Sequence, residues 1–326
     1  MRIIRDYQNV PEECQGLVLA IGNFDGVHRG HQTVIAHAQD AADRLGVPSG
    51  VLTFEPHPRE FFAPDAPPFR LSTMETKAAH LNWLGVDVMA AVNFDLTFSQ
   101  KTAEEFVKDV LVDGFQAVQV VVGYDFIFGH KRHGTTVVLA ELAKKYGFDV
   151  TVVEPVGEET VIFSSTAIRE CLKQGNPSQA ASLLGHWWEV EGEVIEGDKR
   201  GRTIGFPTAN IPLVGYHQPK LGVYAVRVGL HKGTHVDWID GVANFGKRPT
   251  FDKQDVLLEA HLLDFDGDLY GQSLRVAFVD FIRPEMKFGG LEQLEAQIAE
   301  DVETARRLLS DTNNRQTKYA DKKVHS

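Results

Sequence analysis

Leu17-Val18-Leu19-Ala20-Ile21-Gly22-Asn23-Phe24-Asp25-Gly26-Val27-His28-Arg29-Gly30-His31 is the stretch that decides the fold of the first half of the chain. Its five leading apolar residues predict a buried strand, the glycines that follow predict a turn, and the last residues open a helix. A helix that starts in this way offers unpaired N–H groups and a positive dipole to phosphate. Because His28 and His31 fall at the helix start, we expect their imidazoles to donate hydrogen bonds to oxygens that gain charge during phosphoryl or nucleotidyl transfer.

Two other interpretations of these histidines are open from the residues alone. A hydrogen-bonded surface pair is the common situation of an isolated histidine, but an HxGH pattern between a strand and a helix favours a nucleotide site. A zinc site is the weaker alternative, because the pair has no obvious third ligand nearby. The turn residues expected to contact nucleotide or phosphate are Gly22, Asn23, Phe24, Asp25, Gly26 and Gly30.

The rest of the first half alternates apolar runs with amphipathic stretches, which is typical of a parallel sheet covered by helices. Ser72 with Glu75, and Thr102 with Glu105, have the spacing of capping boxes at helix starts. Further buried strands are expected at 50–54, 86–92, 118–122 and 150–153. One helical stripe is formed by Val34, Ile35, Ala38, Ala42 and Leu45. The pattern predicts an α/β domain of the Rossmann type over residues 1–186.

The pattern of predicted secondary structure changes after Trp187-Trp188, where β-rich segments follow one another without long helices between them. This predicts a small antiparallel β-barrel or sandwich over residues 187–310. Its expected strands are Trp188 to Ile195, Gly222 to Val228, Val256 to Leu263 and Leu274 to Ile282. Apolar residues at helical spacing predict a final helix from Leu291 to Leu309, and the polar residues 311–326 are expected to be a disordered tail.

Composition bounds the class of protein. The chain has 326 residues, of which 43% are hydrophobic, enough for two cores. A formal net charge of −12 argues against broad binding to nucleic acid, which needs clustered Lys and Arg. Only two cysteines occur, without metal-type spacing, and no apolar run reaches the length of a signal peptide or membrane span. We therefore expect a cytoplasmic protein whose partners are small molecules, without nucleic acid or membrane. Self-association is left open.

Three further segments of the first half have functional and plain structural interpretations. The run Phe54-Glu55-Pro56-His57-Pro58, with Phe62 beyond it, places prolines and aromatics at a strand end, where a planar ring could lodge or an ordinary loop could pack. Gly123-Tyr124-Asp125 also follows a buried strand, and Asp125 suits contacts to backbone or ribose better than base catalysis. Ser164-Ser165-Thr166, with Arg169 one turn later, suits either helix capping or phosphate binding.

A second constellation lies past the middle of the chain. Residues 197–205 form a glycine-rich basic loop, in which Gly197, Lys199, Arg202 and Gly205 suit phosphate. The loop runs into Pro207-Thr208-Ala209-Asn210. The hydroxyl of Thr208 and the amide oxygen of Asn210 supply two hard ligands at i, i+2 that suit Mg²⁺. The loop lacks the Walker pattern, so it is a different kind of phosphate site.

The barrel half carries one further candidate base. Glu259 sits in an alternating apolar strand, where the residues alone allow either a positioned carboxylate or an outward-facing one. Arg283 suits either phosphate or acidic neighbours. Asp264, Asp266 and Asp268 lack the spacing of an EF-hand, which leaves a solvated hairpin turn as their interpretation.

These segments, in this order, resemble bacterial bifunctional riboflavin kinase/FMN adenylyltransferases. HxGH is similar to the motif of the nucleotidyltransferase superfamily, distantly related to class I aminoacyl-tRNA synthetases, and the tetrad at 207–210 resembles the PTAN motif of riboflavin kinases. The resemblance runs from about Gly16 to Leu309, with further matches at 222–224, 244–251, 258–265 and 281–288. The loop 129–135 departs from the glycine- and basic-rich form of the family.

The resemblance implies two consecutive reactions: riboflavin and ATP give FMN, and FMN and ATP give FAD and pyrophosphate, both with Mg²⁺. It assigns Glu259 as general base, the segment from Ser164 to Arg169 as a second phosphate motif, and the flavin to Phe54, Pro56, His57, Pro58, Phe62, Tyr224 and Arg283. The rival hypotheses are a nucleotidyltransferase for pantetheine phosphate or nicotinate mononucleotide with a fused barrel, and a flavin sensor or RNA-binding relative. The PTAN-like constellation opposes the first rival. Retention of the catalytic residue types opposes a decayed sensor, and the acidic charge opposes RNA binding.

Overall fold

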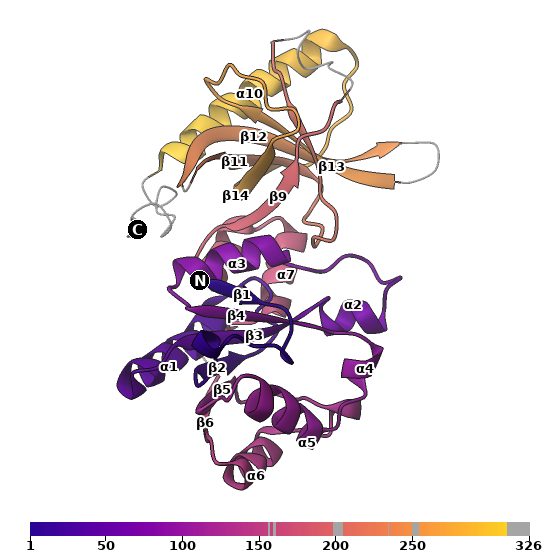
Figure 1. Ribbon diagram of the computed structural model, residues 1–326. Coiled ribbons are helices and arrows are strands. Elements are labelled where there is room, and N and C mark those ends of the chain that lie inside the picture. The colour runs from indigo at the N-terminus through magenta and orange to yellow at the C-terminus, as the bar shows by residue number, and fades with distance from the viewer. Residues whose placement is uncertain (156, 159–160, 198–204, 234, 250–253, 312–326) are drawn as a thin grey trace. The chain divides into compact units, whose positions relative to one another are not determined.

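The computed structural model describes residues 1–155, 157–158, 161–197, 205–233, 235–249 and 254–311. The chain forms two compact units (Figure 1). The first comprises Met1–Pro67 with Lys77–Phe163, and the second comprises Pro68–Thr76 with Ser164–Ser326. Among the described residues, no helix combines the length and the apolar content that a membrane crossing requires.

The first unit is built on a six-stranded sheet in the order β1-β4-β3-β2-β5-β6, and every neighbouring pair in it is parallel. Its strands are β1 (Arg2–Ile4), β2 (Val18–Ile21), β3 (Ser49–Glu55), β4 (Val88–Asn93), β5 (Gln119–Gly123) and β6 (Asp149–Val153). The chain adds strands to one side of β2 and then crosses to the other side at β5. In open α/β sheets, ligands bind beside such a switch, at the carboxyl ends of the strands.

The helices of this unit are α1 (Arg29–Leu45), α2 (Pro58–Phe62), α4 (Leu96–Ser99), α5 (Ala103–Glu105) and α6 (Thr136–Tyr146), with α3 (Met74–Trp83) shared between the units. Short turns and a π-helix complete it: η1 (Glu12–Cys14), η2 (Phe106–Gly114), η3 (His130–Arg132) and a hairpin of β7 (Gly157–Glu158) and β8 (Val161–Ile162). Helix α1 packs on β2, β3 and β5. Buried residues of η2, among them Val107 and Leu111, share one core cluster with Leu19 and Leu52 of the sheet.

Three local expectations for these helices can be checked. The capping box is confirmed, since Thr102 accepts the N–H of Glu105 and the Glu105 carboxylate accepts the N–H of Thr102. The α1 stripe is confirmed except at Leu45, the last residue of the helix before its C-cap Gly46, which is 52% exposed. At α3, Thr73 accepts the N–H of Thr76 at 3.3 Å, next to the expected cap at Ser72.

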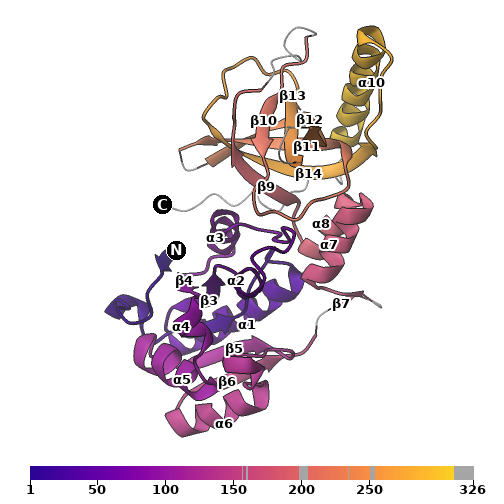
Figure 2. The same ribbon diagram turned by 90° about the vertical axis from the view of Figure 1, so that its right-hand side faces the viewer.

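The second unit is a curled antiparallel sheet in the order β10-β13-β12-β11-β14-β9. Its strands are β9 (Trp188–Glu193), β10 (Ala209–Pro212), β11 (Gly222–Lys232), β12 (His235–Pro249), β13 (Gln254–Leu262) and β14 (Ser273–Arg283). An isolated bridge between Ile195 and Asn210 brings the two edges together. Helix α10 (Leu291–Ser310) lies along the outside of the curl, and its Val302, Ala305 and Leu309 are buried there (Figure 2). The expected tail lies outside the described residues apart from Asp311.

Helices α7 (Ser165–Gln174) and α8 (Pro177–Leu184) belong to the second compact unit, although the sequence places the domain boundary after residue 186. Helix α8 packs against β14, and its Ala180 and Leu184 are 0% exposed. In addition, the Trp188 indole donates to the carbonyl of Leu71 at 3.0 Å. The barrel therefore has packing partners on the amino-terminal side of the expected boundary.

These contacts make a fragment comparison informative. A fragment of residues 185–309 should fold around the barrel core, but it should be less stable than a fragment of residues 164–309 by roughly 2 to 4 kcal/mol, because it loses the apolar area that α8 covers. Urea unfolding of the two fragments, followed by tryptophan fluorescence, measures the difference. Equal midpoints and slopes would mean that α8 does not stabilise the barrel.

Candidate functional site

The motifs of the first unit gather at one edge of its sheet. The HxGH turn follows β2, the Pro56-His57-Pro58 segment follows β3, and Tyr124 follows β5. Since all these strands are parallel, their carboxyl ends meet at the same edge. The expected placement of the three segments on one edge is therefore confirmed.

His28 is the N-cap residue of α1. Its Nδ1 accepts the backbone N–H of His31 at 3.3 Å, and the side chain is only 6% exposed. The two imidazoles are stacked, with ring centroids 3.6 Å apart and an interplanar angle of 18°. Because Nδ1 accepts, the proton of a neutral His28 lies on Nε2, which makes Nε2–H its donor.

His31 carries a buried ring nitrogen, Nδ1, that finds no hydrogen-bond partner among the described residues. Burial, followed by the neighbouring His28 and Lys77, holds the pKa of His31 well below its ordinary value. The ring is therefore neutral at physiological pH and retains one N–H donor. A buried polar atom without a hydrogen-bond partner lowers the stability of the fold. A site in which a polar ligand supplies the partner explains why this atom is present.

The turn before α1 is conformationally strained. Phe24 and Val27 have φ values of 48° and 42°, in the left-handed region that residues with a side chain seldom adopt. Gly30 is needed for close approach, since a Cβ there would lie 3.2 Å from the His28 ring and from the carbonyl oxygen of Phe163. The tight turn therefore sets the position of the histidine rings.

The turn residues expected to contact the nucleotide fall into an exposed group and a buried group. Asn23 is exposed, whereas Phe24 and Asp25 are 1% and 3% exposed. The Phe24 ring meets the His31 ring edge to face at a centroid distance of 5.2 Å. The buried Phe24 side chain therefore packs against the His31 ring. For this reason we withdraw the Phe24 side chain from the expected phosphate contacts. Backbone contacts at Gly22 and Gly26 stay predictions.

An aromatic cluster follows β3 and β4. Phe54 packs on Phe94 and Phe98, and Phe62 packs on Phe94 while remaining 67% exposed. His57 caps α2, because its Nδ1 accepts the N–H of Arg59 at 3.0 Å. An exposed ring on a packed aromatic base is a suitable surface for a planar ligand. Pro56 and Pro58 flank this cap, and their flavin contacts stay predictions.

The segment after β5 is open to solvent. Tyr124 is 46% exposed, Asp125 is exposed, and a Cβ on Gly123 would lie 3.2 Å from the Asp125 carboxylate. In the nearby loop, Lys131 and Arg132 have φ values of 53° and 62° and exposed side chains. This edge of the first unit therefore offers a carboxylate and two cations, in addition to the histidines.

The hydroxyl-rich segment at 164–169 lies in the second compact unit. Ser164 caps α7 by accepting the N–H of Ala167 at 3.2 Å, which confirms capping by this residue, and its phosphate contact stays a prediction. Arg169 donates to the carbonyl of Phe69 at 2.7 Å and stacks over the Phe69 ring. Phosphate contacts by Ser165, Thr166 and Arg169 stay predictions.

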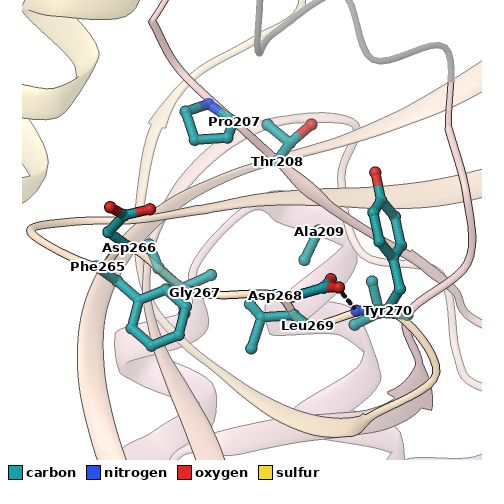
Figure 3. A pocket seen from close by; sticks show the side chains of 11 residues that line it. Pro207, Thr208, Ala209, Phe265, Asp266, Gly267, Asp268, Leu269 and Tyr270 are labelled. Atoms are coloured by element: carbon teal, nitrogen blue, oxygen red, sulfur yellow. Dashed lines mark hydrogen bonds between the residues drawn. The ribbon is translucent and has the colours of Figure 1, made fainter.

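The second constellation opens on a pocket of about 370 Å³ (Figure 3). The segment Pro207-Thr208-Ala209, which leads into β10, runs past the loop from Phe265 to Tyr270, and these two segments supply most of the lining. Asp268 accepts the N–H of Tyr270 at 3.1 Å, while Asp266 lines the pocket. Of the three aspartates interpreted from the sequence as a solvated turn, Asp266 and Asp268 therefore border a pocket, which no local pattern indicates.

Glu259 of β13 lies between two amides. The register pairs it with Asn210 of β10 on one side and Asn244 of β12 on the other, so the three side chains share one face of the sheet. Asn210 is 6% exposed, and a Cβ on Gly197 would lie 2.4 Å from its Nδ2. Lys199 and Arg202 lie outside the described residues, and Gly205 is exposed with a φ of 81°.

Two expected flavin contacts have other partners in this structure. Tyr224 is 1% exposed, its ring packs on Phe278 and Phe281, and burial raises the pKa of its hydroxyl. We therefore withdraw its side chain from the flavin contacts. Arg283 forms a two-pronged ion pair with Asp301 of α10, at 2.8 and 2.7 Å. The sequence allowed Arg283 to pair either with phosphate or with acidic residues, and the ion pair with Asp301 is a contact of the second kind.

Asp264 at the start of the acidic turn is likewise paired. Its two carboxylate oxygens accept hydrogen bonds from Arg306 of α10 at 2.7 and 2.9 Å. Asp264 also has a φ of 56°, which lies in the left-handed region. Both α10 ion pairs join residues that are far apart in the chain, so sequence spacing could not predict them.

Comparison with known proteins gives consistent matches over both units. The family model described as FAD synthetase matches residues 10–167, and the model described as riboflavin kinase matches residues 184–309. The chain is 44% identical to a bifunctional riboflavin kinase/FMN adenylyltransferase of Haemophilus influenzae, over 94% of this chain and 98% of the relative. The Escherichia coli K12 protein of the same name is also 44% identical, over 94% of this chain and 97% of its own length.

A solved structure also resembles the whole chain. A crystal structure from Streptococcus pneumoniae, described as a macrolide-efflux protein, superposes with a TM-score of 0.82 at 32% identity. The match covers 93% of this chain and 98% of that one. The arrangement of a parallel-sheet unit followed by a curled antiparallel unit is therefore shared with a known structure.

Proposed function

The chain belongs to the family of bifunctional riboflavin kinase/FMN adenylyltransferases, and from this premise we propose that residues 1–186 adenylylate FMN while residues 187–310 phosphorylate riboflavin. The observation that carries the division is that each family model covers its own set of candidate residues. His28 and His31 fall within the first match, and Thr208, Asn210 and Glu259 fall within the second. The product of one reaction is the substrate of the other.

In the adenylylation, an oxygen of the FMN phosphate attacks the α-phosphorus of ATP, and the bond to the β-phosphate oxygen breaks to release pyrophosphate. The attacking phosphate is already anionic, so a general base is not required. We assign Nε2–H of His28 and the N–H of neutral His31 as donors to the α- and β-phosphate oxygens on which charge builds. The N-terminus of α1 adds its dipole to the same charge.

In the phosphorylation, the terminal ribityl hydroxyl of riboflavin attacks the γ-phosphorus of ATP, and ADP leaves. We assign Glu259 to accept the proton of that hydroxyl. Its position between Asn210 and Asn244 supports the assignment, because amides on both sides can orient a carboxylate without neutralising it. The basic loop 197–205 and Arg283 remain proposed substrate contacts.

The donor set of the barrel unit fits Mg²⁺. The Thr208 hydroxyl, directly before β10, and the Asn210 amide oxygen, in β10 opposite Glu259, are hard oxygen ligands. Magnesium in kinases is typically held by one or two protein ligands together with substrate phosphates. We propose that Thr208 and Asn210 hold the ion, which when bound neutralises charge on the ATP phosphates.

This proposal makes a measurable prediction. Thr208→Ala or Asn210→Ala should raise the Mg²⁺ concentration needed for half-maximal riboflavin phosphorylation, because each variant lacks one proposed ligand. The affinity for riboflavin should change much less. A Mg²⁺ titration at fixed ATP measures the effect, with Thr304→Ala on helix α10 as a control. An unchanged Mg²⁺ dependence in both variants would mean that the tetrad shapes the loop without binding the ion.

A single incubation tests the function as a whole. Riboflavin and Mg-ATP are supplied together, and FMN and FAD are separated by chromatography over time. FMN should appear first and FAD should follow. A nucleotidyltransferase for another substrate would form neither flavin product, and a flavin sensor would bind flavin without turnover.

We further propose that the enzyme works in the cytoplasm, where its two buried thiols stay reduced. Its proposed partners are small molecules rather than nucleic acid or membrane. Self-association is open to measurement by light scattering.

A further inference from the structure

Lys77 of α3 is buried, with an exposed fraction of 3%. Lysine is rarely buried unless its ammonium is well solvated by protein groups. Its Nζ donates to the carbonyl oxygen of Asn23 at 2.8 Å and to the Thr53 hydroxyl oxygen at 3.2 Å, and Thr53 donates to the same carbonyl at 3.0 Å. Helix α3, strand β3 and the turn after β2 therefore meet at one backbone oxygen.

This oxygen belongs to the peptide group that leads into Phe24. Phe24 has a φ of 48°, and residues in such regions cost about 1 to 3 kcal/mol unless surrounding groups hold them. Two donors on the preceding carbonyl restrict the rotation of this peptide group. Lys77 and Thr53 are therefore placed to hold the strained conformation at the start of the turn.

Ring contacts link the backbone conformation at Phe24 to the two histidines. The Phe24 ring meets His31 at a centroid distance of 5.2 Å, and His31 stacks on His28 at 3.6 Å. A displacement of the Asn23 carbonyl would move the ring that supports His31. The geometry of the two histidines thus depends on a residue that lies 54 positions from Asn23 in the sequence.

We infer that Lys77 is a positioning residue of the adenylylation site, which acts by holding the Asn23 carbonyl and, through Phe24, the His28 and His31 rings. The inference rests on the proposed roles of these histidines. The sequence carries no signal for Lys77, since an isolated lysine in a helix is usually a solvated residue. Its function depends on contacts that only the folded chain creates.

The charge of Lys77 adds to its geometric effect. His28 and Lys77 are the charged or titratable groups that lower the pKa of His31, after burial. Both favour a neutral His31 ring, which keeps a ring nitrogen unprotonated within the stacked pair. A buried cation close to the HxGH turn also favours the approach of anionic phosphates.

The test of Lys77 requires a variant that removes its ammonium group without unfolding the chain. Removing one buried charge is costly where it leaves an opposite buried charge unpaired, but the two acceptors of Lys77 named above are a carbonyl and a hydroxyl, and methionine has nearly the length of the lysine stem. In Lys77→Met the Asn23 carbonyl keeps the Thr53 hydroxyl as a donor. We therefore expect this variant to remain folded while the turn loses its second restraint.

The test measures adenylylation of supplied FMN in the full chain, with Lys144→Met on the exposed face of α6 as the matched control. Lys77→Met should lower kcat about 100-fold, the size of effect that a displacement of about 1 Å produces, while KM for ATP and FMN changes little. Riboflavin phosphorylation and the thermal midpoint should match those of Lys144→Met. Thr53→Val should lower kcat less, and Thr53→Ser, which keeps the hydroxyl, should recover most of that loss.

The outcomes separate this inference from the proposed function. A wild-type adenylylation rate in Lys77→Met, while His31→Ala is inactive, would overturn the role of Lys77 alone. Full activity in His31→Ala would overturn the proposed site itself. Should Lys77→Met not fold, equal rates in Thr53→Val and Thr53→Ser would still contradict the inference.

Discussion

His28→Ala and His31→Ala should each stop FAD formation while leaving FMN formation largely intact. Each variant removes a donor held beside the N-terminus of α1, in a turn whose strained residues fix the ring positions. Loss of one preorganised donor to developing charge costs about 3 kcal/mol of transition-state stabilisation, a factor of ~10² or more in rate. Adenylylation of supplied FMN and phosphorylation of riboflavin, assayed separately on the same preparation, measure the two effects.

The structure adds a complication at His28 that the controls resolve. Because His28 caps α1, His28→Ala also removes a cap worth about 1 kcal/mol of stability. Asn is a good N-cap residue, so His28→Asn keeps the cap while removing the imidazole. His37→Ala, an exposed histidine of the same helix, controls for surface changes. Equal loss of both activities in the His28 or His31 variants would contradict the assignment of these residues to adenylylation.

Glu259→Gln should lower kcat for riboflavin phosphorylation by about 10² to 10⁴, the range that a general base contributes. The amide keeps the shape of the carboxylate between Asn210 and Asn244, so riboflavin binding should survive. Adenylylation should be normal when FMN is supplied directly. The comparison of kcat with KM separates loss of a base from loss of binding.

The matched control for this variant is Glu303→Gln, on the exposed face of α10. It changes charge and shape in the same way, away from the sheet face that carries Glu259. A normal phosphorylation rate in Glu259→Gln would mean that this carboxylate has a structural role and that another group accepts the proton.

Strands with uninterrupted apolar runs were predictable, because such runs have few alternatives to a buried sheet. Strands β2 to β6 of the first unit, the capping box at Thr102 and the helix beginning at Leu291 all follow local patterns, whereas the short strand β1 was not expected. Strand β12 was missed as an element: Gly241, Asn244 and Gly246 interrupt its apolar alternation. It is a strand because β11 and β13 pair with it on both sides.

The sequence alone determined the chemistry available to this protein and its order along the chain. A strand, a glycine-rich turn and HxGH predict a helix start with unpaired N–H groups by local geometry, and Thr208 and Asn210 carry hard oxygen atoms by residue type. These properties reside in neighbouring residues, so no distant contact is needed to predict them.

Only the tertiary structure decided which candidate side chains are available and what holds them. Tyr224 is enclosed by Phe278 and Phe281, and Lys77 donates a hydrogen bond to the carbonyl of Asn23. Each partner is brought close by folding of separate elements, and the partner fixes whether a side chain binds ligand, packs or positions another residue. Burial and pairing depend on the packed neighbours of a residue, so the same residue type can serve any of these roles.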